Sequence, residues 1–405
     1  MKVLHLSTWK EYCGIATYTE QLVNSLDKLG IESEVYPVNR KELAYFSLEE
    51  IEAYFLAFCQ KAAEFDLIHI QHEHGFFHGS YPFSVSVKVF NLILKSLRKT
   101  KKPIFITFHT EPAYFDSYSE DGVGLKGKLL LKTKKYIALF QWRRQVSKFF
   151  QRSRYFVAIV HSKKSRLQLL KSGFDRKSIQ VLTHAFPKRG LQSTAEDTRS
   201  SKRKLGLSEE SIVLSIFGFV SEYKGYKVAI RALSHLPDNF VLAIVGGPHP
   251  EAVSSDAALD NVFETIESVS EQQPSVAQRV LVTGYVETEQ LNEFHKATDI
   301  CLAPYLPSSI SASGALTWAL TSGKPVIASN IPAFRELNQN AACLLLVQPN
   351  AYRELAWRIQ RLIEDAHAQQ ELVNRAALYT QSHTWEATAK SLKKLYEVAL
   401  GKAKL

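Results

Sequence analysis

A lysine between two glycines is the residue of this chain that best suits the binding of an anion. Lys224 lies in the turn GFVSEYKG, residues 218–225, directly after the apolar strand pattern SIVLSIF. Its ammonium group could neutralise a pyrophosphate, as is needed when a nucleoside diphosphate leaves in a reaction. A solvated turn lysine is the alternative. The turn therefore predicts a phosphate contact only together with a second feature on the same edge of a sheet.

That second feature is a serine-rich loop, residues 308–314, which leads into a helical pattern ending at Gly323. The start of such a helix directs unpaired backbone N–H groups and the positive end of the helix dipole at one point, which suits a phosphate or sugar hydroxyls. An ordinary capped core helix is the alternative. Taken with the lysine turn, the loop predicts a phosphate site formed by Gly218, Lys224, Ser309, Ser311, Ser313, Gly314 and Ala315.

Polar residues also follow two strand patterns in the first half of the chain. His72, Glu73 and His74 end the pattern FDLIHIQHEHG, and His109 and Glu111 end KKPIFITFHTEP. Since open α/β sheets bind ligands at the carboxyl ends of their strands, we expect these side chains in a cleft. Metal binding by His72 and His74 is the alternative, but no third ligand is evident nearby, so a hydrogen-bonded or solvated pair is favoured. For His109, a structural role and a substrate contact both stay open.

Alternating strand and helix patterns must position these residues. The chain begins with the strand KVLHLS, a loop with Gly14 and a helical pattern, which is the start of a Rossmann-like unit without a G-x-G-x-x-G fingerprint. The second half repeats the alternation, so we predict an α/β protein of two Rossmann-like, doubly wound domains that face each other across a cleft. The predicted boundaries are 1–187 for the N-terminal domain, 188–204 for a linker, 205–380 for the C-terminal domain, and 381–405 for a helix that packs back toward the N-terminal domain.

A basic and aromatic segment lies in the first half, at residues 126–154. Its lysines and arginines, with no acid between them, alternate with Tyr136, Phe140, Trp142, Phe149 and Phe150. This composition is typical of a basic amphipathic helix on an anionic membrane surface, although nucleic acid or a phosphorylated acceptor would attract the same charges. A solvated helix face with its aromatic side chains in the core is a further alternative. We expect peripheral membrane contact here and no nucleic-acid partner.

Composition narrows the class of protein. The chain has 405 residues and a formal net charge of +10, which favours two domains and an anionic partner. Its four cysteines form no CxxC pair, so we expect buried free thiols. No run of eighteen apolar residues occurs, and the chain starts with a strand pattern. We therefore expect a cytoplasmic protein, with a peripheral position at the inner face of the membrane as a further expectation.

Three stretches resemble the donor-binding domain of glycosyltransferase family four. They are FGFVSEYKGYKVAIRAL, VLVTGYVETEQLNEFHKATDICLAPY and GALTWALTSGKPVIASNIPAFREL, while CGIATYTEQL, IHIQHEHG and ITFHTEP are similar to the family's acceptor domain. The resemblance implies the GT-B fold and a retaining enzyme that uses nucleotide sugars. It also implies that Lys224 contacts the diphosphate, that Gly14 gives the donor phosphates room to approach, and that His109 meets the transferred sugar.

The chain departs from the family pattern at three positions. Phe219 stands where the family usually has an arginine paired with the lysine, and Ile310 and Trp318 stand where it usually has two glutamates. In the family the second glutamate holds the nucleotide ribose and the first a sugar hydroxyl. Hydroxyls and N–H groups of residues 308–314 could replace them. The family needs no metal, and this chain has no Asp-x-Asp, so we expect neither a metal nor another cofactor.

These features predict a metal-independent, retaining hexosyltransferase. It would move a hexose from a nucleoside-diphosphate sugar to a glycan or a lipid-linked acceptor, as in polysaccharide biosynthesis. No pair of carboxylates placed for double displacement is visible. The alternative, motivated by the missing arginine and glutamates, is a catalytically silent GT-B protein that serves as a partner or regulatory subunit.

Overall fold

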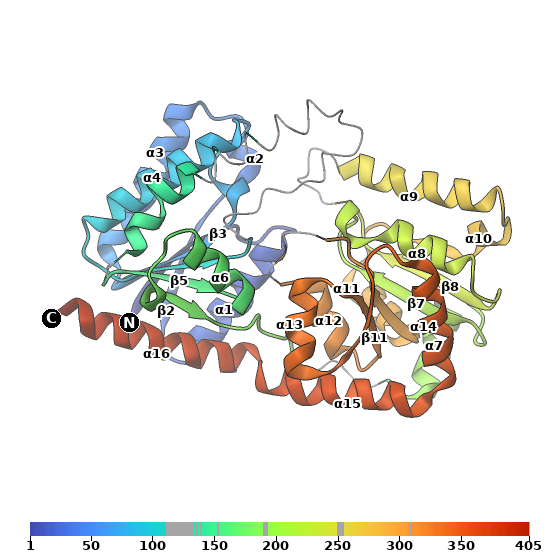
Figure 1. Cartoon of the computed structure of the whole chain (residues 1–405). Coiled ribbons are helices and arrows are strands. Elements are labelled where there is room, and N and C mark those ends of the chain that lie inside the picture. The colour runs from blue at the N-terminus through green and yellow to red at the C-terminus, as the bar shows by residue number, and fades with distance from the viewer. Residues whose placement is uncertain are drawn as a thin grey trace. The chain divides into compact units, whose positions relative to one another are not determined.

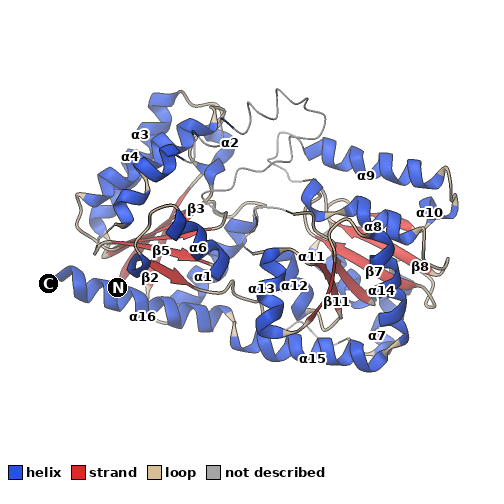
Figure 2. Ribbon diagram, viewed as in Figure 1, coloured by secondary structure: helices blue, strands red, loops and turns tan. Residues whose placement is uncertain are grey.

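The protein folds into two compact units. A computed structural model describes residues 1–110, 133, 137, 140–151, 154–188, 193–248, 255–307, 310 and 312–404. The first unit comprises Met1–Ala185, Ser309–Ala312 and Trp385–Leu405, and the second comprises Phe186–Ser308 and Ser313–Thr384. Each unit contains one parallel sheet with helices beside it (Figure 2). This confirms the predicted α/β class with two Rossmann-like domains.

The sheet of the first unit has the order β2-β1-β3-β4-β5-β6. The strands are β1 (Lys2–Ser7), β2 (Glu32–Pro37), β3 (Leu67–His72), β4 (Ile104–Phe108), β5 (Phe156–Val160) and β6 (Ile179–Val181). Its described helices are α1 (Gly14–Asp27), α2 (Arg40–Leu43), α3 (Leu48–Lys61), α4 (Phe83–Arg98), α6 (Lys163–Lys171) and α16 (Trp385–Lys404), with 3-10 turns η1 (Ala62–Glu64), η2 (His74–Phe76), η4 (Ser147–Phe150) and η5 (Arg176–Ser178).

Alternate residues of these strands pack into two separate cores, because successive side chains of a strand point to opposite faces of the sheet. Leu4 and Ile68 join the cluster with α3 and α4. Val3 and Leu67 join the cluster with α1 and α16 (Figure 1). Both faces are therefore apolar, as expected for an all-parallel sheet covered on both sides.

The sheet of the second unit has the order β12-β11-β10-β7-β8-β9. The strands are β7 (Ile212–Phe217), β8 (Phe240–Val245), β9 (Val280–Val282), β10 (Ile300–Ala303), β11 (Val326–Ser329) and β12 (Leu344–Val347). The described helices are α7 (Ala195–Lys204), η6 (Glu222–Lys224), α8 (Tyr226–Leu233), α9 (Ser255–Ser270), α10 (Ser275–Gln278), α11 (Thr288–Ala297), α12 (Gly314–Thr321), α13 (Pro332–Ala341), α14 (Tyr352–Glu364) and α15 (Ala366–Ser382).

The strand order of the second sheet reverses between β7 and β10, because β8 and β9 extend it on one side and β11 and β12 on the other. Open α/β sheets bind their ligands at such a switch point, outside the carboxyl ends of the strands. The segments that follow these two strands are the lysine turn and the serine-rich loop. The topology therefore supports the prediction that the two features share one edge of one sheet.

The predicted linker, residues 188–204, is wrong in its second half. Residues Ala195–Lys204 form α7, whose first turn is closed by a capping box between Thr194 and Asp197. Lys202 lies buried against the second unit, where its Nζ lies 2.9 Å from a carboxylate oxygen of Asp299. A helix with so few apolar residues has no apolar periodicity, but its cap and its ion pairs hold it on the domain.

The last helix, α16, belongs to the first unit, and α15 to the second. Trp385 and Tyr396 of α16 are buried in the core that also contains Tyr18 of α1. The Lys393 ammonium donates to the carbonyl oxygen of Leu29 at 3.0 Å. Residues 381–405 were predicted to pack toward the N-terminal domain, and the structure places this helix from Trp385 onward in the same unit as that domain.

Candidate functional site

The lysine turn packs its charged group inward. Lys224 ends the short turn η6 and is 4% exposed, and its Nζ donates to the carbonyl oxygen of Phe217 at 3.2 Å. Burial lowers the pKa of this ammonium group from 10.5 to about 7. A buried cation with no carboxylate partner in the described chain is costly, so the site gains from an anionic ligand.

Gly218 allows the ammonium group to approach the end of β7. Its φ is +94°, and a Cβ built there would lie 2.7 Å from the Nζ of Lys224 and 3.4 Å from the Cβ of Ala315. No side chain fits between these atoms, and few residues besides glycine adopt this φ. Gly218 therefore brings together the end of β7, the lysine and the first turn of α12.

Gly225 fixes the other end of the turn. It has a left-handed backbone, with φ +73° and ψ +31°, and a Cβ there would overlap the carbonyl oxygen of Pro304. The N–H of Leu306 donates to the carbonyl oxygen of Tyr223 at 2.7 Å. The lysine turn and the segment that follows β10 are thus packed directly on each other.

Helix α12 begins beside the lysine. Its N-cap is Ser313, whose hydroxyl accepts from the N–H of Leu316 at 3.2 Å and lies 2.9 Å from the hydroxyl of the buried Tyr305. A single cap satisfies only part of a helix N-terminus. In the described chain no hydrogen bond joins the N–H of Gly314 or Ala315 to an acceptor. These groups and the ammonium of Lys224 could bind the oxygens of one phosphate.

The structure adds none of the remaining predicted phosphate ligands to this site. Ser309 and Ser311 lie outside the described residues. Gly14 starts α1 in the first unit, and a Cβ there would contact nothing within 4 Å, so its conformation does not require glycine. Trp318, at the position of a family glutamate, is 49% exposed on α12. Its indole gives this helix an exposed aromatic face where a carboxylate would have placed a negative charge.

His109 is held in a buried polar network at the carboxyl end of β4. Its Nε2 lies 2.9 Å from the amide oxygen of Gln71, and the Gln71 nitrogen lies 3.4 Å from Nε2 of His69. Since an amide oxygen only accepts, Nε2 of His109 carries the proton and Nδ1 is the acceptor nitrogen. Burial lowers the pKa of His109 well below 6.5, which keeps the ring neutral. Glu111, predicted beside it, lies outside the described residues.

The predicted cleft position of His72 does not agree with the structure. His72 is fully buried, and its ring packs against Phe90 at 4.4 Å and against His74 at 4.9 Å between centroids. His74 also contacts the buried Trp142. A strand covered on both faces buries its last residues as well, and aromatic neighbours accept imidazole rings. Glu73 caps η2 by accepting from the N–H of His74.

Sequence reasoning missed a ring of aromatic residues around Tyr18. The Tyr18 side chain packs edge-on to His109, at 4.8 Å between centroids, and to His184 and Trp385. His161 contacts the same tyrosine at 5.5 Å. His161 directly follows β5, as His109 follows β4, so the rule applied to His109 could have found it. Tyr18 and Trp385 lie on helices and gave no such signal.

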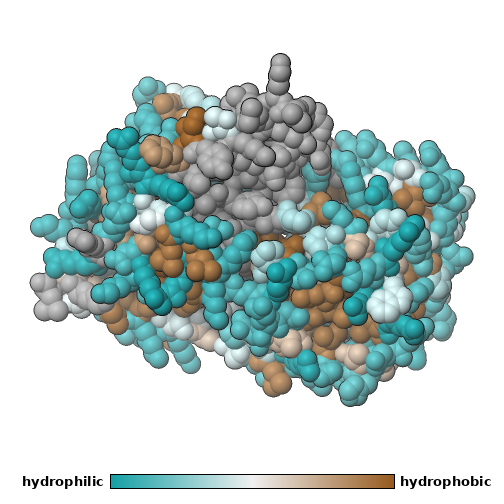
Figure 3. Space-filling view, viewed as in Figure 1, coloured by the Kyte–Doolittle hydropathy of each residue, from teal (hydrophilic) through white to brown (hydrophobic). Residues whose placement is uncertain are grey.

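The described part of the basic segment supports the solvated-face alternative. Trp142, Val146, Phe149 and Phe150 are buried, whereas Arg143, Arg144 and Lys148 are exposed. Phe140 and Ile137 are also exposed, by 62% and 54%. The remainder of 126–154 lies largely outside the described residues. No described helix is long and apolar enough to cross a membrane, and hydrophilic side chains cover most of the face in Figure 3, with apolar groups in smaller patches.

The cysteine prediction is confirmed, because all four cysteines are free and buried. Among the residues that the structure describes, no three His, Cys, Asp or Glu side chains are grouped so that they could hold a metal ion.

Comparison with solved structures identifies the fold. Sucrose-phosphate synthase from Thermosynechococcus elongatus has a TM-score of 0.73 and 17% identity over 99% of this chain and 100% of that one. The Anabaena HepE complex with UDP-glucose has a TM-score of 0.70 and 17% identity, covering 98% of this chain and 100% of that one. Together with the two parallel-sheet units, these neighbours define the GT-B fold.

The match to a known family lies almost entirely within the second unit. Residues 197–379 match the family model of the glycosyl transferases group 1. An uncharacterized glycosyltransferase of Methanocaldococcus jannaschii is 23% identical over 211 residues, or 51% of this chain and 50% of the relative. The D-inositol 3-phosphate glycosyltransferase of Xylanimonas cellulosilytica is 27% identical over 213 residues, or 52% of this chain and 48% of the relative. The chain spans about half the length of these curated relatives.

Proposed function

We propose that this protein is a retaining glycosyltransferase that moves a hexose from a nucleoside-diphosphate sugar to a glycan or lipid-linked acceptor without a metal ion. The observation that carries the proposal is the meeting of Lys224, Gly218 and the start of α12 at the switch point of the second sheet. HepE, which has the same fold, has been solved in complex with UDP and with UDP-glucose, and this supports a nucleotide-sugar donor. The family match over 197–379 supports the same class of donor.

In this mechanism the leaving diphosphate is stabilised by fixed charges. Lys224 gains a proton when the diphosphate enters, and its ammonium group lies where negative charge develops. The N–H groups of Gly314 and Ala315 bind a second set of oxygens. The bond between the anomeric carbon and the phosphate oxygen breaks, and the acceptor oxygen bonds to the same face of that carbon. The departing phosphate takes the acceptor proton, so no carboxylate base is required.

His109 has a positioning role toward the sugar in this proposal. Its Nε2–H is oriented by Gln71, and Gln71 is oriented by His69, whose other nitrogen lies 2.6 Å from the hydroxyl of Tyr396. In the proposal this neutral ring contacts a hydroxyl of the transferred sugar. His72 and His74 have no part in the mechanism, since both are core residues.

Replacing Lys224 by methionine tests the proposal, because methionine keeps the apolar volume and removes the charge. We expect transfer to fall by about a hundredfold or more, as for the loss of a donor to developing charge. The control is Lys204→Met at an exposed position of α7. Transfer within about threefold of wild type would refute the phosphate role of Lys224. Binding of UDP without transfer to any acceptor in a panel would instead support a catalytically silent partner protein.

Membrane contact through residues 126–154 is the weaker part of the proposal. Exposed Arg143, Arg144 and Lys148 lie near exposed Phe140 in the described part of this segment. Each cation near an anionic surface contributes about 1 kcal/mol. The triple change of these cations to glutamine should therefore reduce sedimentation with phosphatidylserine vesicles about a hundredfold at low salt. The control replaces Lys204, Arg353 and Arg361. Equal loss in both proteins would exclude a specific membrane face.

A further inference from the structure

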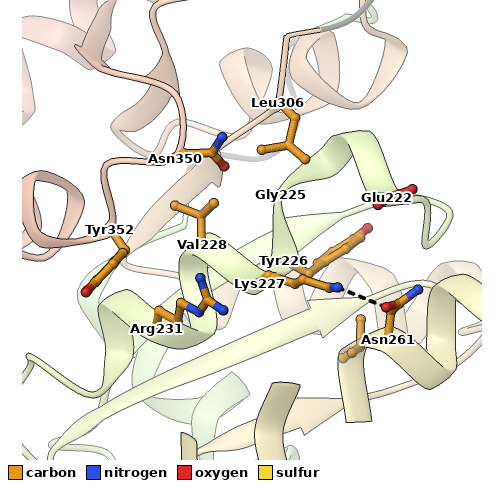
Figure 4. Close-up of a pocket in the computed structure, with 11 residues that line it drawn as sticks. Glu222, Gly225, Tyr226, Lys227, Val228, Arg231, Asn261, Leu306, Asn350 and Tyr352 are labelled. Carbon is orange, nitrogen blue, oxygen red and sulfur yellow. Dashed lines mark hydrogen bonds between the residues drawn. The ribbon is translucent and has the colours of Figure 1, made fainter. Parts of the chain in front are cut away.

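A cavity lies in the second unit beside the lysine turn, and Lys224 is not among its lining residues. It has a volume of about 180 Å³ and is bounded by α8, α9, the start of α14 and the segment after β10. Figure 4 shows Val228 and Leu306 as two apolar walls, with Arg231, Lys227 and Asn350 around them. A cavity of roughly 150 Å³ holds a benzene molecule. The space therefore accommodates an apolar body of about that size.

The rim of this cavity carries two cations from one helix. Lys227 and Arg231 are four residues apart on α8, so they lie on the same face. Both are exposed, and neither forms an ion pair with a described residue. The Lys227 ammonium donates to the amide oxygen of Asn261 at 2.9 Å, which directs it along the cavity edge. Glu222 is the single acid among the lining residues.

Asn350 adds a neutral donor at the opposite wall. Its backbone φ is +61°, a conformation that few residues besides glycine adopt, and asparagine is one of them. Figure 4 shows its side-chain amide directed between Leu306 and Val228. An amide, an ammonium and a guanidinium around an apolar floor suit a ligand with a compact apolar part and a multiply charged oxyanion.

We propose that this cavity binds a small organic phosphate monoester, with the phosphate on Lys227 and Arg231 and the apolar part on Val228 and Leu306. The site is separate from the proposed diphosphate site, and it goes beyond the proposed transfer reaction. Two residues belong both to the wall of the cavity and to the segments that form the proposed diphosphate site. Gly225 and Leu306 line the cavity, and the same residues join the lysine turn to the segment after β10.

This shared wall makes the cavity an effector site. A ligand that contacts Gly225 and Leu306 changes the stability of the turn that positions Lys224, so its binding is coupled to binding at the diphosphate site. Coupling is reciprocal, and each ligand changes the affinity of the other by the same factor. This second part rests on the proposed function, whereas the existence of the cavity site does not.

Calorimetric titration with phenyl phosphate tests the site, because this probe combines a benzene ring with a phosphate monoester. We expect wild type to bind it more tightly than phenol or inorganic phosphate, and Lys227→Gln/Arg231→Gln to bind it at least tenfold more weakly. Arg199→Gln/Arg203→Gln on α7 removes the same charge from cations four residues apart and should bind like wild type. Equal affinity in the two double variants would overturn the proposal.

Two further titrations separate this site from the diphosphate site. Lys224→Met should keep its affinity for phenyl phosphate, and a loss there as large as in the double variant would show that the probe binds at the lysine turn instead. Phenyl phosphate at saturation should change the Kd of UDP by at least threefold. An unchanged Kd would overturn the effector role. If UDP does not bind at all, the proposed function fails while the phenyl phosphate titrations still decide the cavity site.

Discussion

The two units share one architecture, but they differ in what stands at the carboxyl ends of their strands. In the first unit these ends carry buried or half-buried polar side chains, with His69, Gln71 and His109 joined in one hydrogen-bonded network. In the second unit they carry glycines, with Gly218, Gly246 and Gly284 following β7, β8 and β9 at positive φ. One edge carries hydrogen-bonded polar side chains, whereas the other carries glycines around the buried Lys224.

The two sheet edges therefore differ in what they can present to a ligand. Glycines let a ligand or a cation come close to the backbone, as at Gly218, where Lys224 and Ala315 converge. Buried rings orient one another and leave few groups for a ligand. In the proposed function, the second unit would bind the charged donor and the first unit would present one oriented imidazole.

The largest expected difference between the two units is the stability that each loses when the pH falls. Burial lowers the pKa values of His5, His74 and His161 to about 3. The unfolded chain then binds more protons than the folded one between about pH 6.5 and 3, so the stability present above pH 6.5 is lost as the pH falls through this window. At pH 5 each of these histidines costs roughly 2 kcal/mol. In the second unit, burial lowers the pKa of His295 to about 4.

Hydrogen exchange, corrected for its intrinsic pH dependence, measures this difference. Between pH 7 and 5 we expect β1 and β5 to lose far more protection than β7 and β8. His5→Leu should reduce the number of protons taken up on unfolding by about one, so stability should depend less on pH. The reason is that both ring nitrogens of His5 lack a partner in the described chain. His367→Leu, at an exposed position, is the control. Equal loss of protection in both units would contradict the comparison.

Replacing a glycine at the strand ends of the second unit should have a smaller effect on stability. Gly206 provides a closely matched control for Gly225. Gly225 and Gly206 have the same φ of +73°, but a Cβ at Gly225 would overlap the carbonyl of Pro304, whereas Gly206 faces open space. Gly206→Ala should cost about 1 kcal/mol from backbone strain alone. Gly225→Ala should cost roughly 2–4 kcal/mol because overpacking adds to the strain. Urea unfolding measures both, and equal midpoints would show that close approach is not required.

The proton linkage of UDP binding is the smallest of these effects. Since burial lowers the pKa of Lys224 to about 7, the free protein holds this lysine mostly neutral at pH 8, and a bound diphosphate restores its charge. We expect uptake of nearly one proton per UDP at pH 8. Affinity should fall by up to about tenfold per pH unit above 7. Calorimetry in Tris and HEPES measures the uptake. Lys224→Met should abolish it, and its persistence there would assign it to another group.

Much of the sheet architecture could be predicted from local patterns. The strand KVLHLS is β1 without a shift, because its apolar run is bounded by polar turns. Gly323, predicted as a helix end, adopts φ +78° just after α12. Gly218 and Lys224 were predicted as phosphate ligands from spacing, and they do lie together. These features depend on nearby residues, and nearby residues are what a sequence pattern describes.

The features that escaped prediction depend on distant partners. His72 looked like a cleft residue because it ends a strand, but Phe90 and Trp142 enclose it. Helix α7 looked like a linker because it is polar, although Glu293 and Asp299 bind its lysines. The effector cavity combines α8 with Leu306 and Asn350, which lie far apart in the chain. No spacing rule brings such residues together.

The return of α16 to the first unit sets an order on assembly during synthesis. Trp385, Leu392 and Tyr396 complete a core that otherwise consists of residues before Phe186. All residues of the second unit leave the ribosome before these side chains do. The second unit can therefore close its own core while one face of the first stays uncovered, and nascent chains at this stage expose apolar surface that a chaperone could bind.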